Sequence, residues 1–265
     1  MSEDPATQRV LLTLPDMAHV TVERDLVYGE RNGAPLHLDL YRPPRPTTEP
    51  TAIVIFVAGY PGEGFKRFTG TSFREMGAYV SWGELTAASG MTAVTYDNVD
   101  PVEDVRTLLA FLVDHADRLG IDPARIAIWS CSGNVPVALS LMARPAPHIR
   151  CAALCYGYPM DLDGATGVQQ MSAQFGFVNA TAELPFEALA RLPTLIVRAG
   201  KDEVPGLNAS LDPFIARCLD QNFPLTVINY ADGVHAFDLS DDSPRSKQVI
   251  RQILNFLATE LGDMQ

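Results

Sequence analysis

The chain has 265 residues, of which 47% are hydrophobic and 20% are charged, a composition typical of one soluble globular protein. Aspartate and glutamate outnumber lysine and arginine by 32 to 20, so the net charge is -12 at pH 7. Nucleic-acid binding rewards clustered lysine and arginine, and the sequence has no basic run, so we exclude a nucleic-acid partner.

The N-terminal residues and the cysteines indicate the compartment. The first residues are acidic and polar, and they lack the basic and apolar regions of a secretory signal. No stretch has the uninterrupted apolar length of a membrane span, so we expect no membrane partner. Neither zinc-site spacing nor disulfide density is found among the cysteines, which are Cys131, Cys151, Cys155 and Cys218. We therefore expect free thiols, no metal and a cytoplasmic location.

The first part of the chain predicts an arm followed by a β-hairpin. Residues 1–15 have no clear period and are interpreted as a loose N-terminal arm. Apolar side chains then alternate over residues 19–28 and again over residues 36–41, with a glycine-containing turn between the two stretches. We expect His37 and Asp39, which lie at the polar positions of the second stretch, to point to solvent.

Residues 52–58 form a continuous apolar run, which predicts a central strand that is buried on both faces. The run ends in a glycine-rich loop, residues 59–64, where the backbone can approach a ligand closely. The loop lacks the Gly-Lys-Ser/Thr ending of a phosphate-binding P-loop, so a phosphate site is not favoured. The aromatic residues that follow are interpreted mainly as core residues.

The rest of the chain alternates between predicted strands and predicted helices. The expected strands are residues 91–96, 126–129, 150–156, 194–199 and 225–230. The expected helices are residues 84–89 and 135–142 and three more that begin at Asp100-Pro101, Asp212-Pro213 and Ser243-Pro244. Residues 157–184 have no clear period and predict a short cap-like insertion. This alternation predicts one α/β domain over residues 1–265, with a mostly parallel, doubly wound sheet that is flanked by helices.

The most informative stretch is residues 130–134, Ser-Cys-Ser-Gly-Asn, between a predicted strand and a predicted helix. A strand that turns directly into a helix needs small residues two positions before and after its apex, as in the Gly-x-Ser-x-Gly nucleophile elbow. An apex at Cys131 or Ser130 would place a tryptophan or an isoleucine in a crowded flank. An apex at Ser132 has serine and asparagine there, so Ser132 is the predicted nucleophile. Taken alone, the stretch also fits an ordinary strand–turn–helix.

Two further residues follow later strands. Asp202 comes after the strand at residues 194–199, and His235 comes after the last strand. Because catalytic groups of open α/β sheets gather outside the carboxyl ends of the strands, we expect Ser132, Asp202 and His235 to lie together. Each has a chemical role, since a serine hydroxyl needs a base, a neutral imidazole can act as one, and a carboxylate orients the imidazole.

The sequence has more than one carboxylate in a position to serve as the acid. Glu203 adjoins Asp202, and Asp161 and Asp163 follow the preceding strand. Glu203 is expected to leave the chain in a different direction from its neighbour, and the other two lie in a sequence where aspartate commonly serves a turn. We therefore favour Asp202. The histidines other than His235 are interpreted as surface or locally packed residues.

Residues 36–43 through residues 233–237, and the serine, acid and histidine between them, resemble the α/β-hydrolase superfamily, in particular its esterases and dienelactone-hydrolase-like members. The resemblance implies a Ser132–Asp202–His235 triad and an oxyanion hole made by the N–H groups of Gly133 and Tyr60. The family usually has His-Gly in the loop that supplies the second donor, where this chain has Ala58-Gly59. Dienelactone hydrolase uses a cysteine nucleophile, so its lactone substrate is not carried over.

The resemblance implies a cofactor-independent serine hydrolase that cleaves short or medium carboxylic esters through an acyl-enzyme. The partner expected for such an enzyme is a small-molecule ester. Three alternatives stay open, because a fold does not fix a chemistry. They are a non-catalytic binding protein of the same fold, a lactone or C–C hydrolase, and a peptidase. The oligomeric state is not predicted.

Overall fold

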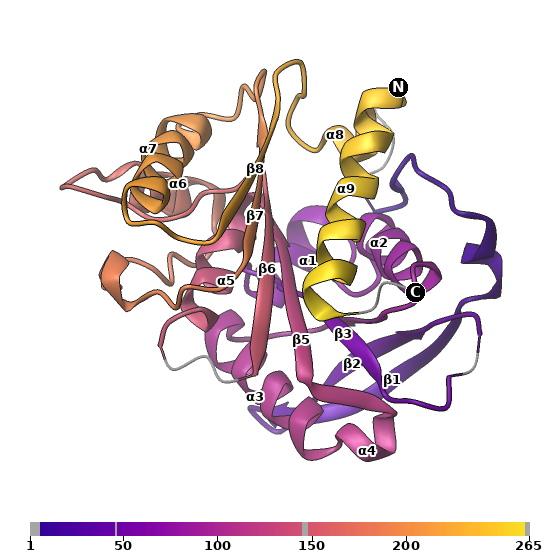
Figure 1. Ribbon diagram of the computed structural model, residues 1–265. Helices are drawn as coiled ribbons and strands as arrows, with labels where there is room; N and C mark the ends of the chain where they lie inside the picture. The colour runs from indigo at the N-terminus through magenta and orange to yellow at the C-terminus, as the bar shows by residue number, and fades with distance from the viewer. Residues whose placement is uncertain (1–5, 46, 145–147, 263–265) are drawn as a thin grey trace.

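A computed structural model describes residues 6–45, 47–144 and 148–262 of the chain (Figure 1). Its centre is an eight-stranded sheet in the order β1-β2-β4-β3-β5-β6-β7-β8. The strands are β1 (Thr21–Arg31), β2 (Ala34–Arg42), β3 (Thr51–Phe56), β4 (Thr92–Tyr96), β5 (Ile121–Cys131), β6 (Ile149–Cys155), β7 (Thr194–Ala199) and β8 (Leu225–Tyr230). The sheet contains every strand that the sequence predicts.

The sheet is antiparallel at one end and parallel elsewhere. The β1–β2 hairpin and the β2–β4 pair are antiparallel, and β3 to β8 pair with their neighbours in parallel. All residues of β3 and β4 are buried, as their apolar sequences require of strands covered on both faces. β8 forms the opposite edge and is largely exposed. The predicted mostly parallel sheet with an N-terminal hairpin is confirmed.

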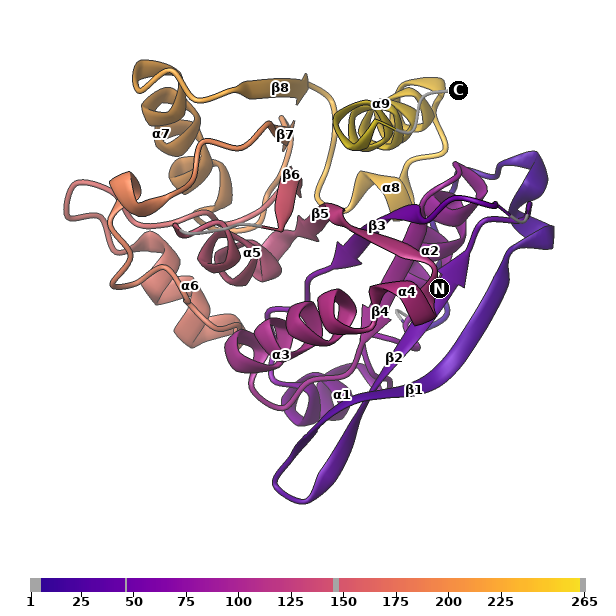
Figure 2. The same ribbon diagram turned by 60° about the horizontal axis from the view of Figure 1, so that its bottom comes forward.

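Helices cover both faces of the sheet. They are α1 (Gly62–Thr69), α2 (Gly77–Ala88), α3 (Pro101–Asp114), α4 (Ala116–Leu119), α5 (Val135–Leu141), α6 (Gly167–Phe175), α7 (Leu207–Asp220), α8 (Phe237–Ser240) and α9 (Pro244–Leu261), with short 3-10 turns η1 (Pro15–His19), η2 (Ser132–Asn134) and η3 (Phe186–Ala188). Figures 1 and 2 show α9 on one face and α3 and α5 on the other. One cluster of buried apolar side chains extends from Val10 to Leu261.

Two predicted helix starts are confirmed and one is wrong. The Asp100 side chain accepts hydrogen bonds from the first N–H groups of α3, and Ser243 caps α9 in the same way. Asp212-Pro213 does not open a helix, because α7 begins at Leu207 and contains Pro213 in its interior. Leu207 and Leu211 are buried before the proline, so packing of that first turn extends the helix past the predicted start.

The N-terminal arm is packed rather than loose from Ala6 on, and residues 1–5 of the predicted arm lie outside the described residues. Val10 and Leu12 are buried. The Val10 N–H donates to Ser81 Oγ at 2.9 Å, and the Leu11 N–H donates to the Asp238 carbonyl at 2.9 Å. Apolar residues are too few in this segment to form a periodic pattern in the sequence. Burial of Val10 and Leu12 is nevertheless enough to hold the arm against the rest of the protein.

Asp39 does not point to solvent as expected. Its side chain is fully buried, and its carboxylate pairs with Arg74 at 2.7 Å and with Arg24 at 3.1 Å. Arg74 also binds Asp97 at 3.0 Å. Arg74 belongs to the segment between α1 and α2, and this segment covers the face of the hairpin on which Asp39 lies. Asp39 therefore faces an ion-pair network instead of water.

We predict that Asp39→Asn lowers the free energy of unfolding by about 3 kcal/mol. Breaking a buried ion pair leaves the remaining charge poorly compensated, at a typical cost of about 3–5 kcal/mol, and Arg74 keeps its other carboxylate partners. The control is Glu103→Gln, which removes an exposed ion pair with Arg106 and should change stability by less than about 1 kcal/mol. Urea denaturation measures both, and equal midpoints would contradict the prediction.

Within the described part of the chain, no helix is both long and apolar enough to cross a bilayer. The four cysteines are free thiols, as the sequence predicts.

Candidate active site

Ser132 stands at the apex of a sharp turn between β5 and η2. Its φ angle is 53°, in the left-handed region that non-glycine residues rarely adopt, so the backbone is strained at this residue. The crowded flanks are Ser130 and Asn134, and both are buried. Gly157 lies against the elbow, since a Cβ there would be 3.0 Å from the Ser132 carbonyl oxygen. This is the conformation that the elbow sterics predict.

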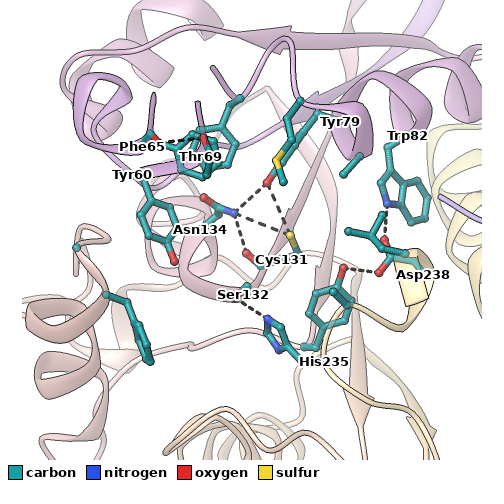
Figure 3. Close-up of a pocket in the computed structure, with 18 of the residues that line it drawn as sticks. Tyr60, Phe65, Thr69, Tyr79, Trp82, Cys131, Ser132, Asn134, His235 and Asp238 are labelled. Carbon is teal, nitrogen blue, oxygen red and sulfur yellow. Dashed lines mark hydrogen bonds between the residues drawn. The ribbon is translucent and has the colours of Figure 1, made fainter. Parts of the chain in front are cut away.

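The structure brings the three sequence-predicted residues together. The Ser132 Oγ lies 3.1 Å from His235 Nε2, and His235 Nδ1 lies 2.7 Å from Asp202 Oδ2. The Asp202 side chain is fully buried, whereas 28% of the His235 side chain is exposed. Asp202 therefore lies at the Nδ1 side of the imidazole and Ser132 at its Nε2 side. Figure 3 shows the contact between Ser132 and His235.

The loops after β7 and β8 are tied to each other, which fixes Asp202 relative to His235. The Gly200 N–H donates to the Tyr230 carbonyl at 2.7 Å, and the Lys201 N–H donates to the Gly233 carbonyl at 2.8 Å. A side chain at Gly200 would have its Cβ 2.3 Å from the Ala231 carbonyl oxygen. Glycine is therefore required for the close approach of the two loops.

The rival carboxylates are occupied elsewhere. Asp161 accepts hydrogen bonds from the Val168 and Gln169 N–H groups at the start of α6, at 2.8 and 2.9 Å. Asp163 pairs with Arg217 at 2.7 Å. Glu203 is exposed, as expected from its different direction along the chain. Asp202 is the carboxylate whose hydrogen bond reaches His235.

The two rival apex residues are also placed differently from Ser132. Ser130 is fully buried, and its hydroxyl has no hydrogen-bond partner within the described residues. The Cys131 sulfur lies 3.7 Å from the Tyr79 hydroxyl and 3.9 Å from Asn134 Nδ2. Burial raises the pKa of the Cys131 thiol to about 12, so it is protonated at neutral pH.

The loop after β3 is anchored on the elbow. Asn134 Oδ1 accepts the Gly59 N–H at 2.7 Å, while Asn134 Nδ2 donates to the Tyr79 hydroxyl at 2.9 Å. A Cβ at Gly59 would lie 2.6 Å from Asn134 Cα and 2.9 Å from the Gly133 carbonyl oxygen. The backbones of the loop and the elbow therefore touch, and only glycine allows this approach.

The N–H groups of Tyr60 and Gly133 are the ones that bear on an oxyanion hole. Three N–H groups of the same segment have acceptors: Ala58 donates to the Tyr96 hydroxyl at 3.1 Å, Gly59 to Asn134, and Gly62 to Asn98 Oδ1 at 3.2 Å, while Pro61 carries no N–H group. Within the residues that the structure describes, the N–H groups of Tyr60 and Gly133 donate to no protein acceptor. These are the two donors that the resemblance implies for an oxyanion hole.

We predict that Gly59→Ala lowers kcat/KM for ester substrates by at least about tenfold, because the methyl group pushes the loop away from the elbow. The control is Gly167→Ala at the start of α6, where the nearest atom to the new Cβ is 3.9 Å away. It should stay within about twofold of the wild type. Steady-state kinetics of the two variants decide, and equal activities would contradict the prediction.

Ser132 and His235 open into a cavity of about 600 Å³. Most of its lining is apolar or aromatic and comes from α1, α2, β5, the end of β6 and α8, with Gln174–Gly176 from the insertion after β6. Sequence reasoning treated the aromatic segment after β3 mainly as core. Tyr79 and Trp82 are in fact both buried and part of the cavity wall, because α2 packs beside the carboxyl end of the sheet.

Two polar residues of the site were not predicted from the sequence. Asn134 was judged only as a small flank, and its bridge to the Gly59 loop depends on a contact between distant segments. Asp238 lines the cavity from α8. The sequence feature that could have indicated its place in the site is its position three residues after His235. Among the described residues, no group of three His, Cys, Asp or Glu side chains could hold a metal ion.

The comparisons with known proteins bear on the fold. No family model and no curated protein matches the chain by sequence. Solved structures do match. The esterase LipW from Mycobacterium marinum superposes with a TM-score of 0.69 at 18% identity, covering 92% of this chain and 82% of that one.

Two other solved esterases superpose equally well. The Pyrobaculum calidifontis esterase matches with a TM-score of 0.68 at 19% identity, over 90% of this chain and 85% of its own. Est2 of the planctomycete Thermogutta terrifontis, solved with propionate bound, matches with a TM-score of 0.68 at 18% identity, over 94% of this chain and 97% of its own. At this level of identity the superpositions establish the fold, and the chain therefore has the α/β-hydrolase fold that the resemblance implies.

Proposed function

We propose that the protein is a cofactor-independent serine hydrolase that cleaves carboxylic esters. The observation that carries the proposal is the hydrogen-bonded series Ser132–His235–Asp202, with Ser132 strained at the apex of its turn. A serine hydroxyl next to a neutral imidazole whose other nitrogen faces a buried carboxylate is the arrangement that activates a nucleophile. The esterase neighbours add support by fold.

Acylation begins when the Ser132 oxygen attacks the ester carbonyl while its proton passes to His235 Nε2. The carbonyl oxygen becomes an oxyanion, and the free N–H groups of Tyr60 and Gly133 are the donors we assign to it. His235 then gives the proton to the leaving alcohol as the C–O bond breaks, and the acyl group stays on Ser132. Asp202 keeps the Nδ1 proton of the imidazole in place and stabilises its charged form.

Deacylation repeats these steps with water in place of the serine. His235 takes a proton from the water as its oxygen attacks the acyl carbon, and the same proton returns to Ser132 Oγ as the acid leaves. Each of the proposed acylation and deacylation steps uses only the side chains and N–H donors already named.

We also propose that short or medium acyl groups are preferred. The cavity volume of about 600 Å³ lies in the range of small-molecule sites. The only segment of the insertion after β6 in the cavity lining is Gln174–Gly176, within the described residues, and Phe175 is 41% exposed. A wall of this size supports a partly open site rather than a closed lipid tunnel. The propionate in the T. terrifontis structure is a short acid of this class.

A substrate panel tests the proposed function. Purified protein is assayed with nitrophenyl esters of increasing acyl length, lactones and aminoacyl amides, each with the Ser132→Ala variant as a blank. We expect turnover of short and medium esters by the wild type alone. Turnover confined to lactones or amides, or no turnover of any ester, would overturn the assignment.

A further inference from the structure

The cavity that contains Ser132 also contains a buried carboxylate with no assigned role. Asp238 is 2% exposed and lies three residues after His235. Its Oδ1 accepts the Tyr156 hydroxyl at 2.7 Å, and its Oδ2 accepts Trp82 Nε1 at 2.8 Å (Figure 3). Each oxygen therefore has one neutral donor, and a carboxylate oxygen can accept a further hydrogen bond.

Asp238 has no arginine or lysine partner within the described residues. Asp39 and Asp104 are also buried and pair with arginines, the latter with Arg31, and the buried side chain of Asp202 faces His235. No ion pair within the described residues includes Asp238. Burial raises the pKa of the Asp238 carboxyl, and the hydrogen bonds from Tyr156, Trp82 and the Asp238 backbone, together with the charge of His235, offset this only in part. The fold leaves a buried carboxylate poorly compensated beside the nucleophile.

The walls around this carboxylate are aromatic. Tyr79, Trp82, Trp129 and Tyr156 all line the cavity, and the rings of the two tryptophans are 4.9 Å apart. Trp129 Nε1 has no hydrogen-bond partner within the described residues. Aromatic faces attract ammonium groups by cation–π interaction, and a desolvated carboxylate adds charge and a hydrogen-bond acceptor. The net charge of -12 also favours the approach of cations.

We propose that this end of the cavity binds an ammonium group, so that the preferred substrates are esters that carry a basic amine. The inference rests on the proposed ester hydrolysis for the reaction, but the cation site rests on Asp238 and the aromatic walls alone. The competing explanation is structural: Asp238 only holds Trp82 and Tyr156, the latter at the unusual φ of 36°. That explanation predicts no response to charge in a ligand.

Binding is measured first, because it needs no turnover. Trp82 and Trp129 are the only tryptophans of the sequence, and both line the cavity, so intrinsic fluorescence reports on this site. The probes are choline and its carbon isostere, in which a tert-butyl group replaces trimethylammonium. We expect choline to saturate the fluorescence change at a concentration at least about tenfold lower than the isostere does. Equal concentrations would overturn the cation site.

Asp238→Asn tests the carboxylate, and Glu203→Gln is the control that removes one negative charge at an exposed position. We expect the preference for choline to fall by at least about fivefold in Asp238→Asn and to persist in Glu203→Gln. If both variants keep the preference, Asp238 is not the anion. If Asp238→Asn fails to fold, the comparison of choline with its isostere on the wild-type protein still tests whether the cavity prefers a cation.

Turnover separates this inference from the proposed function. Nitrophenyl esters of dimethylamino acids with increasing spacer length are compared with their isopropyl isosteres. We expect a preference of at least about tenfold in kcat/KM for the amine at the best spacer length. Turnover without preference overturns the cation site and leaves the esterase. Choline selectivity without any ester turnover overturns the esterase and leaves the cation site.

Discussion

Replacing Ser132 by alanine should abolish ester turnover, with kcat reduced by at least about a thousandfold. The reason is that the hydroxyl 3.1 Å from His235 Nε2 is the atom we assign to attack, and no neighbouring group can replace it. Ser130 is fully buried, and the Cys131 thiol is protonated at neutral pH. Steady-state kinetics on a short nitrophenyl ester measure the loss.

The matched control for this variant is Cys131→Ala. Cys131 is adjacent in sequence, and its sulfur faces Tyr79 rather than His235. The variant should keep most of the wild-type kcat, with a modest loss of stability from the vacated space. An active Ser132→Ala together with an inactive Cys131→Ala would show that the elbow is misassigned and that the enzyme uses a thiol.

The second large effect is expected for Asp202→Asn, which should lower kcat by at least about a hundredfold. Asp202 Oδ2 lies 2.7 Å from His235 Nδ1, and an amide there can leave the imidazole in the tautomer that cannot accept the serine proton. In serine enzymes this change costs up to about 10⁴ in kcat. The variant should fold normally, since asparagine has nearly the same shape, and circular dichroism checks this.

Two carboxylates serve as controls for Asp202. Glu203→Gln changes an exposed side chain and should stay within about twofold of the wild type. Asp161→Asn should also keep its kcat, because the Asp161 carboxylate holds the first N–H groups of α6 and not the imidazole. If Asp161→Asn loses its kcat and Asp202→Asn keeps it, the triad acid is the residue that follows β6 and not Asp202.

The chain order of strands and polar residues was enough to predict much of the fold and the site. Each strand from β3 to β8 contains a largely apolar run with a glycine or a polar residue shortly after it, so the approximate position of its carboxyl end can be predicted from the sequence. Ser132, Asp202 and His235 each follow such an end, and parallel strands bring their ends to one edge of the sheet. Their hydrogen-bond distances, however, come from the structure alone.

Contacts between distant segments were beyond the sequence pattern. Asp39 occupies a polar position of an alternating strand, which predicts exposure to solvent. It is buried because Arg74, from a distant segment, covers it and pairs with its carboxylate. Trp82 and Asp238 are 156 residues apart and meet because α2 and α8 both border the cavity. Periodicity within a segment reports which face is apolar, but it does not report which other segment covers the remaining face.

The most direct test of the account is the site of covalent labelling. A fluorophosphonate reacts with an activated serine hydroxyl, so the labelled residue identifies the nucleophile. The wild-type protein is treated with a fluorophosphonate, digested, and analysed by mass spectrometry. We predict a single adduct on Ser132 that His235→Ala slows by at least about a hundredfold. An adduct on Cys131 or Ser130, or no adduct on a folded protein, would contradict the account.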